Sequence, residues 1–205
     1  MKIAVFVSGN GSNLEALLAA EKKNDLAGAE IALVVSDKSG AYALERARKY
    51  EKKTFILEKK DIPDREEYDK KIAEELEKEK IDFVVLAGFM RILSKYFVAK
   101  YQNRLLNVHP ALLPAFKGAH GIKDAHDYGV KVTGVTVHFV TNELDSGPII
   151  LQKAVQIKEG ESIESLEKRI HRTEHLLYPE AVRLFAEGKI ETDGKKVRIK
   201  KSNKK

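Results

Sequence analysis

The stretch "KIAVFVSGNGSNLEALLAAEKK" (residues 2–23) decides the fold, because it joins an apolar run to a helical one through a glycine turn. Residues 2–8 form a β-rich run that is typical of a buried strand, and residues 12–23 have the composition of a helix. Gly9 and Gly11 lie between the two runs. The stretch therefore predicts a strand, a tight turn and a helix in succession.

The same alternation continues along the chain. Further strands are expected at 31–37, 54–57, 82–87 and 104–109, and further helices at 43–53 and 65–80. Strands that alternate with helices favour a parallel sheet with both faces covered. We therefore predict an α/β protein with an open, mostly parallel twisted sheet of the Rossmann-like kind.

The pattern changes after residue 130. Two strand-like runs at 133–140 and 149–157 are separated by a turn-rich segment, which predicts an antiparallel strand pair in the C-terminal part. A final helix is expected to begin at Ser162 and to end near Gly188. After it, Asp193-Gly194 predicts a hairpin turn.

Composition limits the possible functions. With 205 residues, of which 43% are apolar and 33% charged, the chain is expected to form a globular protein. Its apolar stretches are too short for a membrane span or a secretory leader. The sequence has no cysteine, which excludes disulfides, thiolate catalysis and cysteine-bound metals and predicts a cytoplasmic protein.

The net charge is +6, and much of the excess lies in the tail "KKVRIKKSNKK" at residues 195–205. A surface that binds nucleic acid would interleave basic and aromatic residues, and this tail has no aromatic residue. We interpret the tail as a solvated basic end. Neither nucleic acid nor a membrane is an expected partner.

The glycine turn "SGNGSNL" (8–14) has two possible functions and one purely structural explanation. Backbone N–H groups at a helix start favour an anion, usually a phosphate, and Ser12 and Asn13 would add side-chain donors. A dinucleotide is disfavoured because Leu14 stands where the third glycine of that fingerprint would be. Ser12 and Glu15 also fit a capping box, which would explain Ser12 but not the two glycines. We favour phosphate binding.

Two polar residues interrupt the apolar run "LLNVHPALLP" (105–114). Asn107 and His109 are two positions apart, so on a strand they share a face, and Pro110 ends the regular ladder after them. In open α/β sheets, ligands bind beyond the carboxyl ends of the strands. Either residue alone would more often be a satisfied core residue. Together, an amide and an imidazole in one crevice are suited to stabilising a developing oxyanion.

Asp145, in "ELDSGP", is a possible third member of this group. Aspartate is common before such turns because it makes local hydrogen bonds, which is the simplest explanation of this residue. A carboxylate near His109 would instead favour the imidazolium and raise the pKa of His109. The sequence alone leaves both explanations open.

Three stretches together resemble one family. They are "SGNGSNL", "VLAGFMRIL" (85–93) with "LLNVHPALLP", and "VTVHFVTNELDSGPIILQ" (135–152). In this order they are similar to the phosphoribosylglycinamide formyltransferases, folate-dependent enzymes of purine biosynthesis, and the resemblance extends to about Gly188. It implies transfer of a formyl group from 10-formyltetrahydrofolate to the amino group of glycinamide ribonucleotide, with no metal and no covalent enzyme intermediate.

The resemblance also implies roles for individual residues. Asn107 and His109 would stabilise the oxyanion, and Asp145 would keep His109 protonated. The substrate-binding residues would be Gly11, Ser12 and Asn13 for the phosphate and Glu174 for the ribose hydroxyls. The folate-binding residues would be Arg65, Met90, Arg91, Ile92, Leu93, Asn107, Thr141, Asn142, Glu143, Leu144 and Asp145.

A single formyltransferase domain would then extend over residues 1–188. Its N-terminal half, about 1–100, would bind the phosphate, and its C-terminal half, about 101–188, would hold the folate and the catalytic residues. Residues 189–205 would form a short hairpin and the basic tail. The expected partners are small-molecule substrates alone, bound by a monomer or a homodimer.

The segment "HRTEH" also matches the zinc motif H-x-x-E-H. A third ligand would have to come from a later element, and few residues follow, so we expect no metal. The resemblance needs only Glu174 and His175 from this segment, and His171 is expected to be incidental to catalysis. His138 is expected at the site wall in a supporting role, and His120 is a possible loop ligand.

Other enzymes share an Asn–His–Asp core of this kind. Methionyl-tRNA formyltransferase has an additional C-terminal domain and formyltetrahydrofolate hydrolase an N-terminal regulatory domain, so the chain length argues against both. Sugar-amine formyltransferases have the same core. A nucleotide-binding module without catalysis is the alternative from another class, and such a module would be indifferent to His109→Asn.

Overall fold

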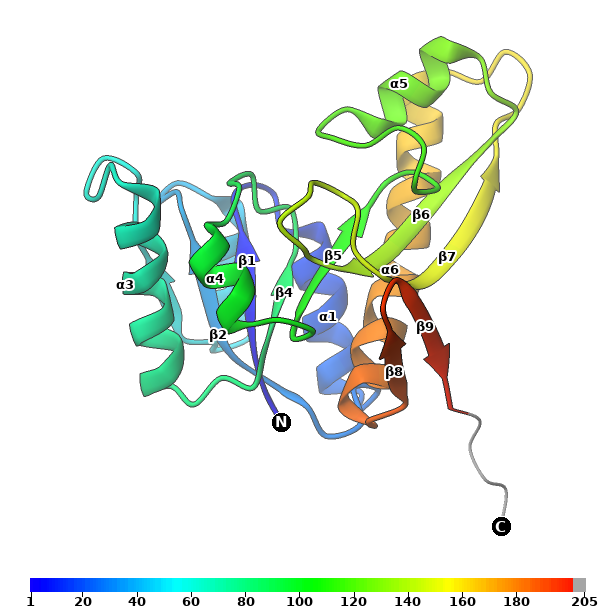
Figure 1. The fold of residues 1–205 in the computed structure, drawn as a ribbon. Helices are drawn as coiled ribbons and strands as arrows, with labels where there is room; N and C mark the ends of the chain where they lie inside the picture. Colours follow the sequence, from blue (N-terminus) through cyan, green and yellow to red (C-terminus); the bar gives the residue numbers. More distant parts are fainter. Residues whose placement is uncertain (201–205) are drawn as a thin grey trace.

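The computed structural model describes residues 1–200, and the last five residues of the predicted basic tail lie outside the described residues. A seven-stranded sheet forms the centre of the molecule, with the order β3-β2-β1-β4-β5-β6-β7 (Figure 1). The strands are β1 (Lys2–Val7), β2 (Glu30–Ser36), β3 (Thr54–Ile56), β4 (Phe83–Leu86), β5 (Leu105–His109), β6 (Val132–Phe139) and β7 (Ile149–Gln156). The first five are parallel, and β6 and β7 add two antiparallel pairings. The predicted fold class is confirmed.

Helices cover both faces of this sheet. They are α1 (Ser12–Lys22), α2 (Tyr42–Lys49), α3 (Arg65–Lys78), α4 (Lys95–Lys100), α5 (Gly121–Tyr128) and α6 (Ile163–Ala186). Helices α1, α2 and α6 pack on one face and α3 and α4 on the other. The short helix α4 is not among the elements predicted from the sequence. No helix within residues 1–200 is both long enough and apolar enough to cross a membrane.

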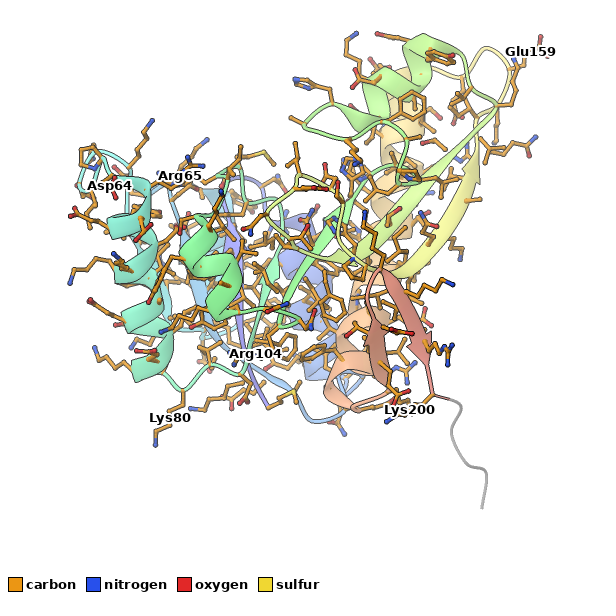
Figure 2. The ribbon with its side chains drawn as sticks, viewed as in Figure 1. Asp64, Arg65, Lys80, Arg104, Glu159 and Lys200 are labelled. Carbon is orange, nitrogen blue, oxygen red and sulfur yellow. The ribbon has the colours of Figure 1, made fainter. Side chains whose placement is uncertain are left out.

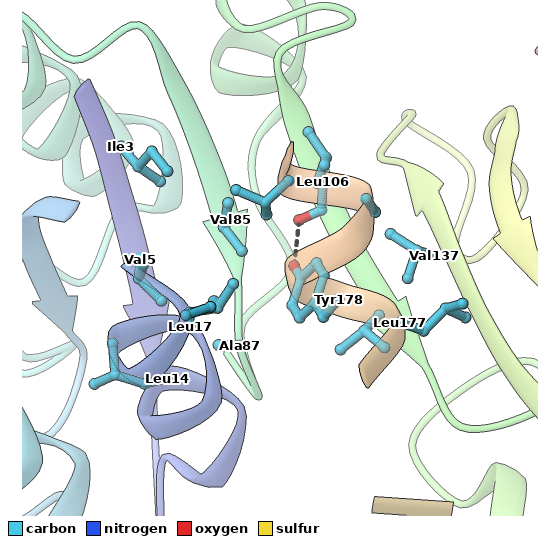
Figure 3. Packing of buried hydrophobic residues seen from close by; sticks show 14 of the residues in the cluster. Ile3, Val5, Leu14, Leu17, Val85, Ala87, Leu106, Val137, Leu177 and Tyr178 are labelled. Carbon is cyan, nitrogen blue, oxygen red and sulfur yellow. Dashed lines mark hydrogen bonds between the residues drawn. The ribbon is translucent and has the colours of Figure 1, made fainter. Parts of the chain in front are cut away.

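Alternation along the strands builds two separate apolar layers, because successive side chains point to opposite faces. Ile3 and Val5 of β1 join the layer under α1 and α6, whereas Ala4 and Phe6 join the layer under α3 and α4. Figure 3 shows the first layer, in which Leu14 and Leu17 of α1 lie against β1 and Tyr178 of α6 lies against β5. This burial on both faces explains the nearly continuous apolar strands.

The side chain of Tyr178, on α6, contacts two neighbouring strands of the sheet. Its buried hydroxyl lies 2.8 Å from the carbonyl oxygen of Leu86 in β4 and 3.0 Å from that of Leu106 in β5, and Figure 3 draws the contact with Leu106. A hydroxyl has one hydrogen to donate, so the two carbonyls share it. Burial raises the pKa of Tyr178 well above its ordinary value, which keeps this donor protonated.

The starts of α6 and α1 differ from each other. The Ser162 side chain accepts a hydrogen bond from the backbone N–H of Ser165 at 3.3 Å, so α6 begins where the sequence predicts. At α1 the cap is Gly11, with a left-handed φ of 76° and no side-chain cap. Glu15 pairs with Arg46 of α2 instead. The capping-box interpretation of Ser12 and Glu15 is therefore wrong, because the chain makes its turn at Gly11.

A hairpin follows α6. Its strands are β8 (Ile190–Asp193) and β9 (Lys196–Ile199), and Asp193 pairs with Lys196. The turn residues are Gly194 and Lys195, one position later than predicted. Gly194 has a φ of 57°, so the left-handed position falls to the residue that tolerates it best.

The order of the strands reverses between β1 and β4. From β1 the chain proceeds outward to β2 and β3, then returns to β4 on the other side of β1. The loops after β1 and β4 consequently leave the sheet in opposite directions, and a crevice opens between them. Such a topological switch point is where open α/β sheets bind ligands.

Candidate active site

A cavity of about 1000 Å³ lies at this crevice and extends along the carboxyl ends of β1, β4 and β5. The structure brings most of the predicted site residues to its wall. They are Gly11, Ser12, Asn13, Met90, Arg91, Ile92, Asn107, His109, Leu144, Asp145 and Glu174. These residues come from five separate segments, so the convergence is a property of the fold and not of one local motif.

Five predicted folate-binding residues do not line this cavity among residues 1–200. Leu93 is buried in the apolar layer beside α3 and α4. Thr141, Asn142 and Glu143 are exposed on the loop between β6 and β7. Arg65 is exposed at the first residue of α3, at the loop end of the sheet and next to Asp64 (Figure 2). Their predicted roles therefore depend on a ligand that extends beyond the cavity.

Asn107 and His109 share one face of β5, as their spacing predicts. Leu106 and Val108 alternate with them and enter the apolar layer on the other face. Strand β6 lies antiparallel beside β5 and places His138 directly opposite Asn107. Nδ2 of Asn107 is 3.3 Å from Nε2 of His138, so His138 contacts the amide that was predicted to act.

His109 is nearly enclosed, with 3% of its surface exposed. Its Nε2 lies 2.7 Å from the carbonyl oxygen of Phe116, and its Nδ1 lies 3.5 Å from Oδ2 of Asp145. Both ring nitrogens thus face acceptors, a geometry that suits the imidazolium. Burial works against that charge and outweighs it, so the pKa of His109 is lowered from its ordinary value although Asp145 raises it.

This result corrects the expectation that Asp145 would raise the pKa of His109 overall. The carboxylate acts in the predicted direction, but the sequence does not reveal how completely the ring is buried. Burial lowers the pKa of His109, and the carboxylate of Asp145 reduces this shift without reversing it. The neutral ring is therefore favoured over the cation.

Asp145 lies at the centre of the polar group. Oδ2 accepts a hydrogen bond from the backbone N–H of Gly118 at 2.8 Å, and Oδ1 is 3.6 Å from Nε2 of His138. Burial alone would raise the pKa of Asp145. The contact with His138, the Gly118 N–H and the nearby His109 lower it, and the net shift is downward. Asp145 is thus ionised at neutral pH.

Both loops that enclose His109 contain strained backbone. Asp145 has a φ of 47° and Phe116 a φ of 51°, which are left-handed values that side chains other than glycine rarely adopt. Aspartate tolerates this region better than phenylalanine does. The nearby Gly147 has no room for a side chain, because a Cβ there would lie 1.8 Å from the carbonyl oxygen of Phe139.

The opposite wall of the cavity is formed by α1 and α6. Because no side chain caps α1, the first N–H groups of that helix are directed toward the cavity that Ser12 and Asn13 line. Oε2 of the buried Glu174 accepts from Nδ2 of Asn13 at 3.0 Å and from Nδ1 of His171 at 2.9 Å. The hydrogen bond to Glu174 raises the pKa of His171. This wall therefore offers donors for an anion beside an acceptor for hydroxyl groups.

In the H-x-x-E-H segment, His171 and Glu174 are hydrogen-bonded to each other, and Glu174 also binds Asn13. Within residues 1–200, no cluster of three or more histidine, aspartate or glutamate side chains is arranged to hold a metal ion. His171 binds Glu174 and does not pair with His175 across a metal site. His120 is exposed at the start of α5.

Some residues of the cavity wall have no signal in the sequence. Lys38 and Lys168 line the cavity but belong to no motif that was singled out, and Ser8 and Arg172 lie in motifs in which they were given no role. His138 was expected only as a supporting residue, and its contact with Asn107 depends on the register of β6. Alternation along β6 could have placed His138 on one face, but not opposite a particular residue.

An amide, an imidazole and a carboxylate converge at the carboxyl end of a doubly wound sheet, which is an arrangement found in α/β enzymes and chemically suited to stabilising a developing oxyanion. The chain belongs to the formyl transferase family, whose sequence profile matches residues 1–182. Membership in this family implies a folate-type formyl donor and small-molecule substrates.

Individual relatives agree with this assignment. The chain is 44% identical over 190 residues to phosphoribosylglycinamide formyltransferase of Escherichia coli, which covers 93% of this chain and 89% of that protein. It is also 44% identical over 191 residues to the trifunctional purine biosynthetic protein adenosine-3 of Gallus gallus, of whose length it spans 19%.

A solved structure gives the same result for the fold. The crystal structure of glycinamide ribonucleotide transformylase 1 from Symbiobacterium toebii superposes with a TM-score of 0.95 at 44% identity. The match covers 98% of this chain and 94% of the other. The overall fold is therefore that of a known enzyme.

Proposed function

We propose that this protein transfers the formyl group of 10-formyltetrahydrofolate to the amino group of 5-phosphoribosylglycinamide. The products are formylglycinamide ribonucleotide and tetrahydrofolate, and the reaction is a step of de novo purine biosynthesis. The observation that carries the proposal is the convergence of Asn107, His109 and Asp145 in a cavity whose far wall joins Asn13 to Glu174. The similarity to phosphoribosylglycinamide formyltransferases supports it.

The donor supplies an activated formyl carbon, and the protein stabilises the charge that develops on the formyl oxygen. A new bond forms between the substrate amine and that carbon, and the bond from the carbon to N10 of the folate then breaks. Nδ2 of Asn107 has two hydrogens; one faces Nε2 of His138 and the other is available to the oxygen. Both ring nitrogens of His109 face protein acceptors, so the ring supplies the second donor when its Nε2 exchanges the carbonyl oxygen of Phe116 for the formyl oxygen.

One proton must also move, from the attacking amine to N10 of the leaving folate. Asp145 is ionised and lies 3.5 Å from Nδ1 of His109, so it favours the protonated form of that ring while charge accumulates in the cavity. His109 has a lowered pKa because of its burial, which favours the neutral ring, a form that can accept a proton. No covalent bond to the enzyme is required.

The ribonucleotide fits the wall formed by α1 and α6. Its phosphate accepts hydrogen bonds from the uncapped start of α1 at Gly11, Ser12 and Asn13, where the helix dipole also favours an anion. Its ribose hydroxyls donate to Glu174, whose carboxylate is oriented by Asn13 and His171. This arrangement directs the glycinamide end toward Asn107.

The folate fits the apolar side of the cavity. Met90, Ile92 and Leu144 line the cavity with 69%, 67% and 58% of their surfaces exposed, which is unusual for side chains of this type. A planar pterin would cover them. The folate's glutamyl part would then extend toward Arg65, with residues 141–145 across the bound pterin.

The remaining parts of the proposal concern the setting of the enzyme. A cytoplasmic location is in keeping with a sequence that contains no cysteine. The substrates are small molecules, and neither nucleic acid nor a membrane takes part. The active unit is a monomer or a homodimer.

Release of tetrahydrofolate tests the proposed function. The purified, metal-stripped protein is mixed with 10-formyltetrahydrofolate, and release is followed with and without glycinamide ribonucleotide. Release only in the presence of the ribonucleotide is the expected result. Equal release in its absence would instead indicate formyltetrahydrofolate hydrolase, and no release in either case would contradict both activities.

A further inference from the structure

We propose that Ser8 and Asp69 are positioning residues of the folate site. They hold the two ends of the segment of residues 88–94, here named the wall segment, from which Met90, Arg91 and Ile92 line the cavity. Neither residue belongs to the predicted site. The inference rests on the proposed function, because it concerns where the folate binds.

Ser8 holds the first end of the wall segment. It is the residue after β1, it is 4% exposed, and it lies at the switch point between β1 and β4. Its backbone N–H donates to the carbonyl oxygen of Gly88 at 3.2 Å, and its Oγ accepts from the backbone N–H of Met90 at 2.8 Å. The loop that leaves β4 is thereby joined to the loop that leaves β1.

Asp69 holds the second end. It lies on the buried face of α3, between Tyr68 and Ile72, and only 1% of its surface is exposed. Its Oδ2 accepts from the backbone N–H of Ser94 at 2.5 Å. Burial raises the pKa of Asp69, which reflects the cost of placing a carboxyl group in an apolar layer. The hydrogen bond to the end of the wall segment is the interaction that offsets this cost.

Between these two ends, apolar packing holds Phe89, whose ring contacts Phe6, and the buried Leu93, but not the residues that face the cavity. The side chains of Met90 and Ile92 are more than half exposed, so packing does not hold them. The Arg91 guanidinium lies over the ring of Tyr68 at 3.7 Å, and the Tyr68 hydroxyl donates to the carbonyl oxygen of Leu57 at 2.5 Å. Helix α3 thus holds the wall segment through two adjacent residues, a stacking contact at Tyr68 and a hydrogen bond at Asp69.

The folate side and the ribonucleotide side of the cavity should therefore respond differently when one end of the wall segment loses its hydrogen bond. The wall segment would lose its shape and bind the folate less well, because the affinity depends on a preorganised surface. The ribonucleotide wall, which α1 and α6 form, does not contact Asp69. A positioning role thus predicts a loss of affinity for the folate and no loss of affinity for the ribonucleotide.

The test compares Asp69→Ala with Asp69→Asn and Ser94→Ala. Asp69→Ala removes the acceptor, whereas Asp69→Asn retains an oxygen in the same position. Ser94→Ala removes the Oγ, which caps α4 by accepting from the N–H of Phe97 and also contacts Asp69, but it keeps the N–H that Asp69 binds. Ser94→Ala therefore separates the contacts of the Oγ from the backbone hydrogen bond that holds the wall segment.

For each variant, the KM values of both substrates and kcat are measured, together with equilibrium binding of tetrahydrofolate under nitrogen. We expect Asp69→Ala to raise the folate KM and the dissociation constant of tetrahydrofolate by about tenfold to a hundredfold. The ribonucleotide KM should not change, and Asp69→Asn should restore the folate KM. Ser94→Ala should lower the midpoint of urea unfolding and raise the folate KM much less than Asp69→Ala does.

An unchanged folate KM in a folded Asp69→Ala variant would overturn the inference, and so would equal losses for both substrates. If Asp69→Ala does not fold, Ser94→Pro replaces it, because Ser94 has a φ of −70° that proline adopts and proline has no N–H to donate. The wild-type protein is assayed alongside. Its failure to transfer formyl would contradict the proposed function, whereas the comparison of tetrahydrofolate binding would still test the inference.

Discussion

Asn107 and His138 contact each other across the antiparallel pair of β5 and β6, with Nδ2 of the amide 3.3 Å from Nε2 of the ring. Nδ1 of His138 lies 2.8 Å from the carbonyl oxygen of Phe139, and a carbonyl can only accept, so Nδ1 holds the hydrogen. Nε2 of the neutral ring is then an acceptor. His138 thereby sets which atom of the Asn107 amide is directed into the cavity.

Replacing His138 should therefore impair catalysis more than binding. We expect His138→Ala to lower kcat by about tenfold to a hundredfold, somewhat less than the loss of an oxyanion donor itself. The KM values for both substrates should change little, because the ring does not reach the walls where they bind. Steady-state kinetics with each substrate varied will check this. An unchanged kcat would show that Asn107 is oriented without His138.

The pKa of His109 should fall when the charge of Asp145 is removed. The carboxylate is 3.5 Å from Nδ1 and opposes the effect of burial, so Asp145→Asn leaves burial unopposed. Titration of the His109 ring by nuclear magnetic resonance should show this fall, and kcat should decrease in parallel. Asp127→Asn is the control, because Asp127 contacts His126 on the exposed face of α5. A rise in the His109 pKa on Asp145→Asn would contradict this account.

How well the sequence predicts this fold depends on the range of the interactions that decide each element. Residues 2–23 carry a local signal, because strand alternation, a glycine at φ 76° and a helical run each involve neighbouring residues. The same holds for Ser162, which caps α6 through a residue three positions away. The hairpin turn was predicted one position early. In the structure Asp193 pairs with Lys196 in the ladder, so the loop consists of Gly194 and Lys195.

The site was predictable where its residues resemble a known pattern and not where it depends on long-range register. Asn107 and His109 share a face by alternation alone, but the partner of Asn107 is 31 positions away on β6. The pKa of His109 depends on enclosure by Phe116 and Asp145, which follows from two loops with left-handed residues. Asp69 could not be singled out, because it reads as one charged residue on a highly charged helix.

Stability should depend on pH through His171 and Glu174. The hydrogen bond to Glu174 raises the folded-state pKa of His171 above its ordinary value of 6.5, so the folded state binds this proton more tightly than the unfolded state does. The stabilisation is complete below the unfolded pKa and is lost as pH rises through the folded pKa. His171→Ala should therefore destabilise the protein more at about pH 5.5 than at about pH 9.

Urea unfolding of the wild type and of His171→Ala at the two pH values will measure this difference. The half-exposed side chain of His171 limits its size through solvent screening. A matched comparison is His120→Ala, at an exposed residue that precedes α5. An equal loss at both pH values for His171→Ala would mean that packing, and not charge, accounts for the effect of the substitution.

Gly147→Ala should disrupt the loop that carries Asp145. A Cβ at this position would overlap the carbonyl oxygen of Phe139, which belongs to the backbone and cannot move aside without displacing β6. We expect a loss of roughly 1–3 kcal/mol in the free energy of unfolding, together with a lower kcat. Gly40→Ala is the control, since a Cβ there meets nothing within 4 Å. Thermal denaturation and steady-state assays of both variants will distinguish them.

The hydrogen bond between Asn13 and Glu174 joins residues 161 positions apart, and it has a consequence for how the protein acquires its function. A ribosome that has synthesised the sheet has not yet produced α6, so the nascent chain has the start of α1 but not the carboxylate opposite it. The proposed ribonucleotide wall is therefore completed late in synthesis, by closure of a long loop. An unfinished chain would lack the carboxylate of this wall, so we expect it to bind the ribonucleotide more weakly than the complete protein does.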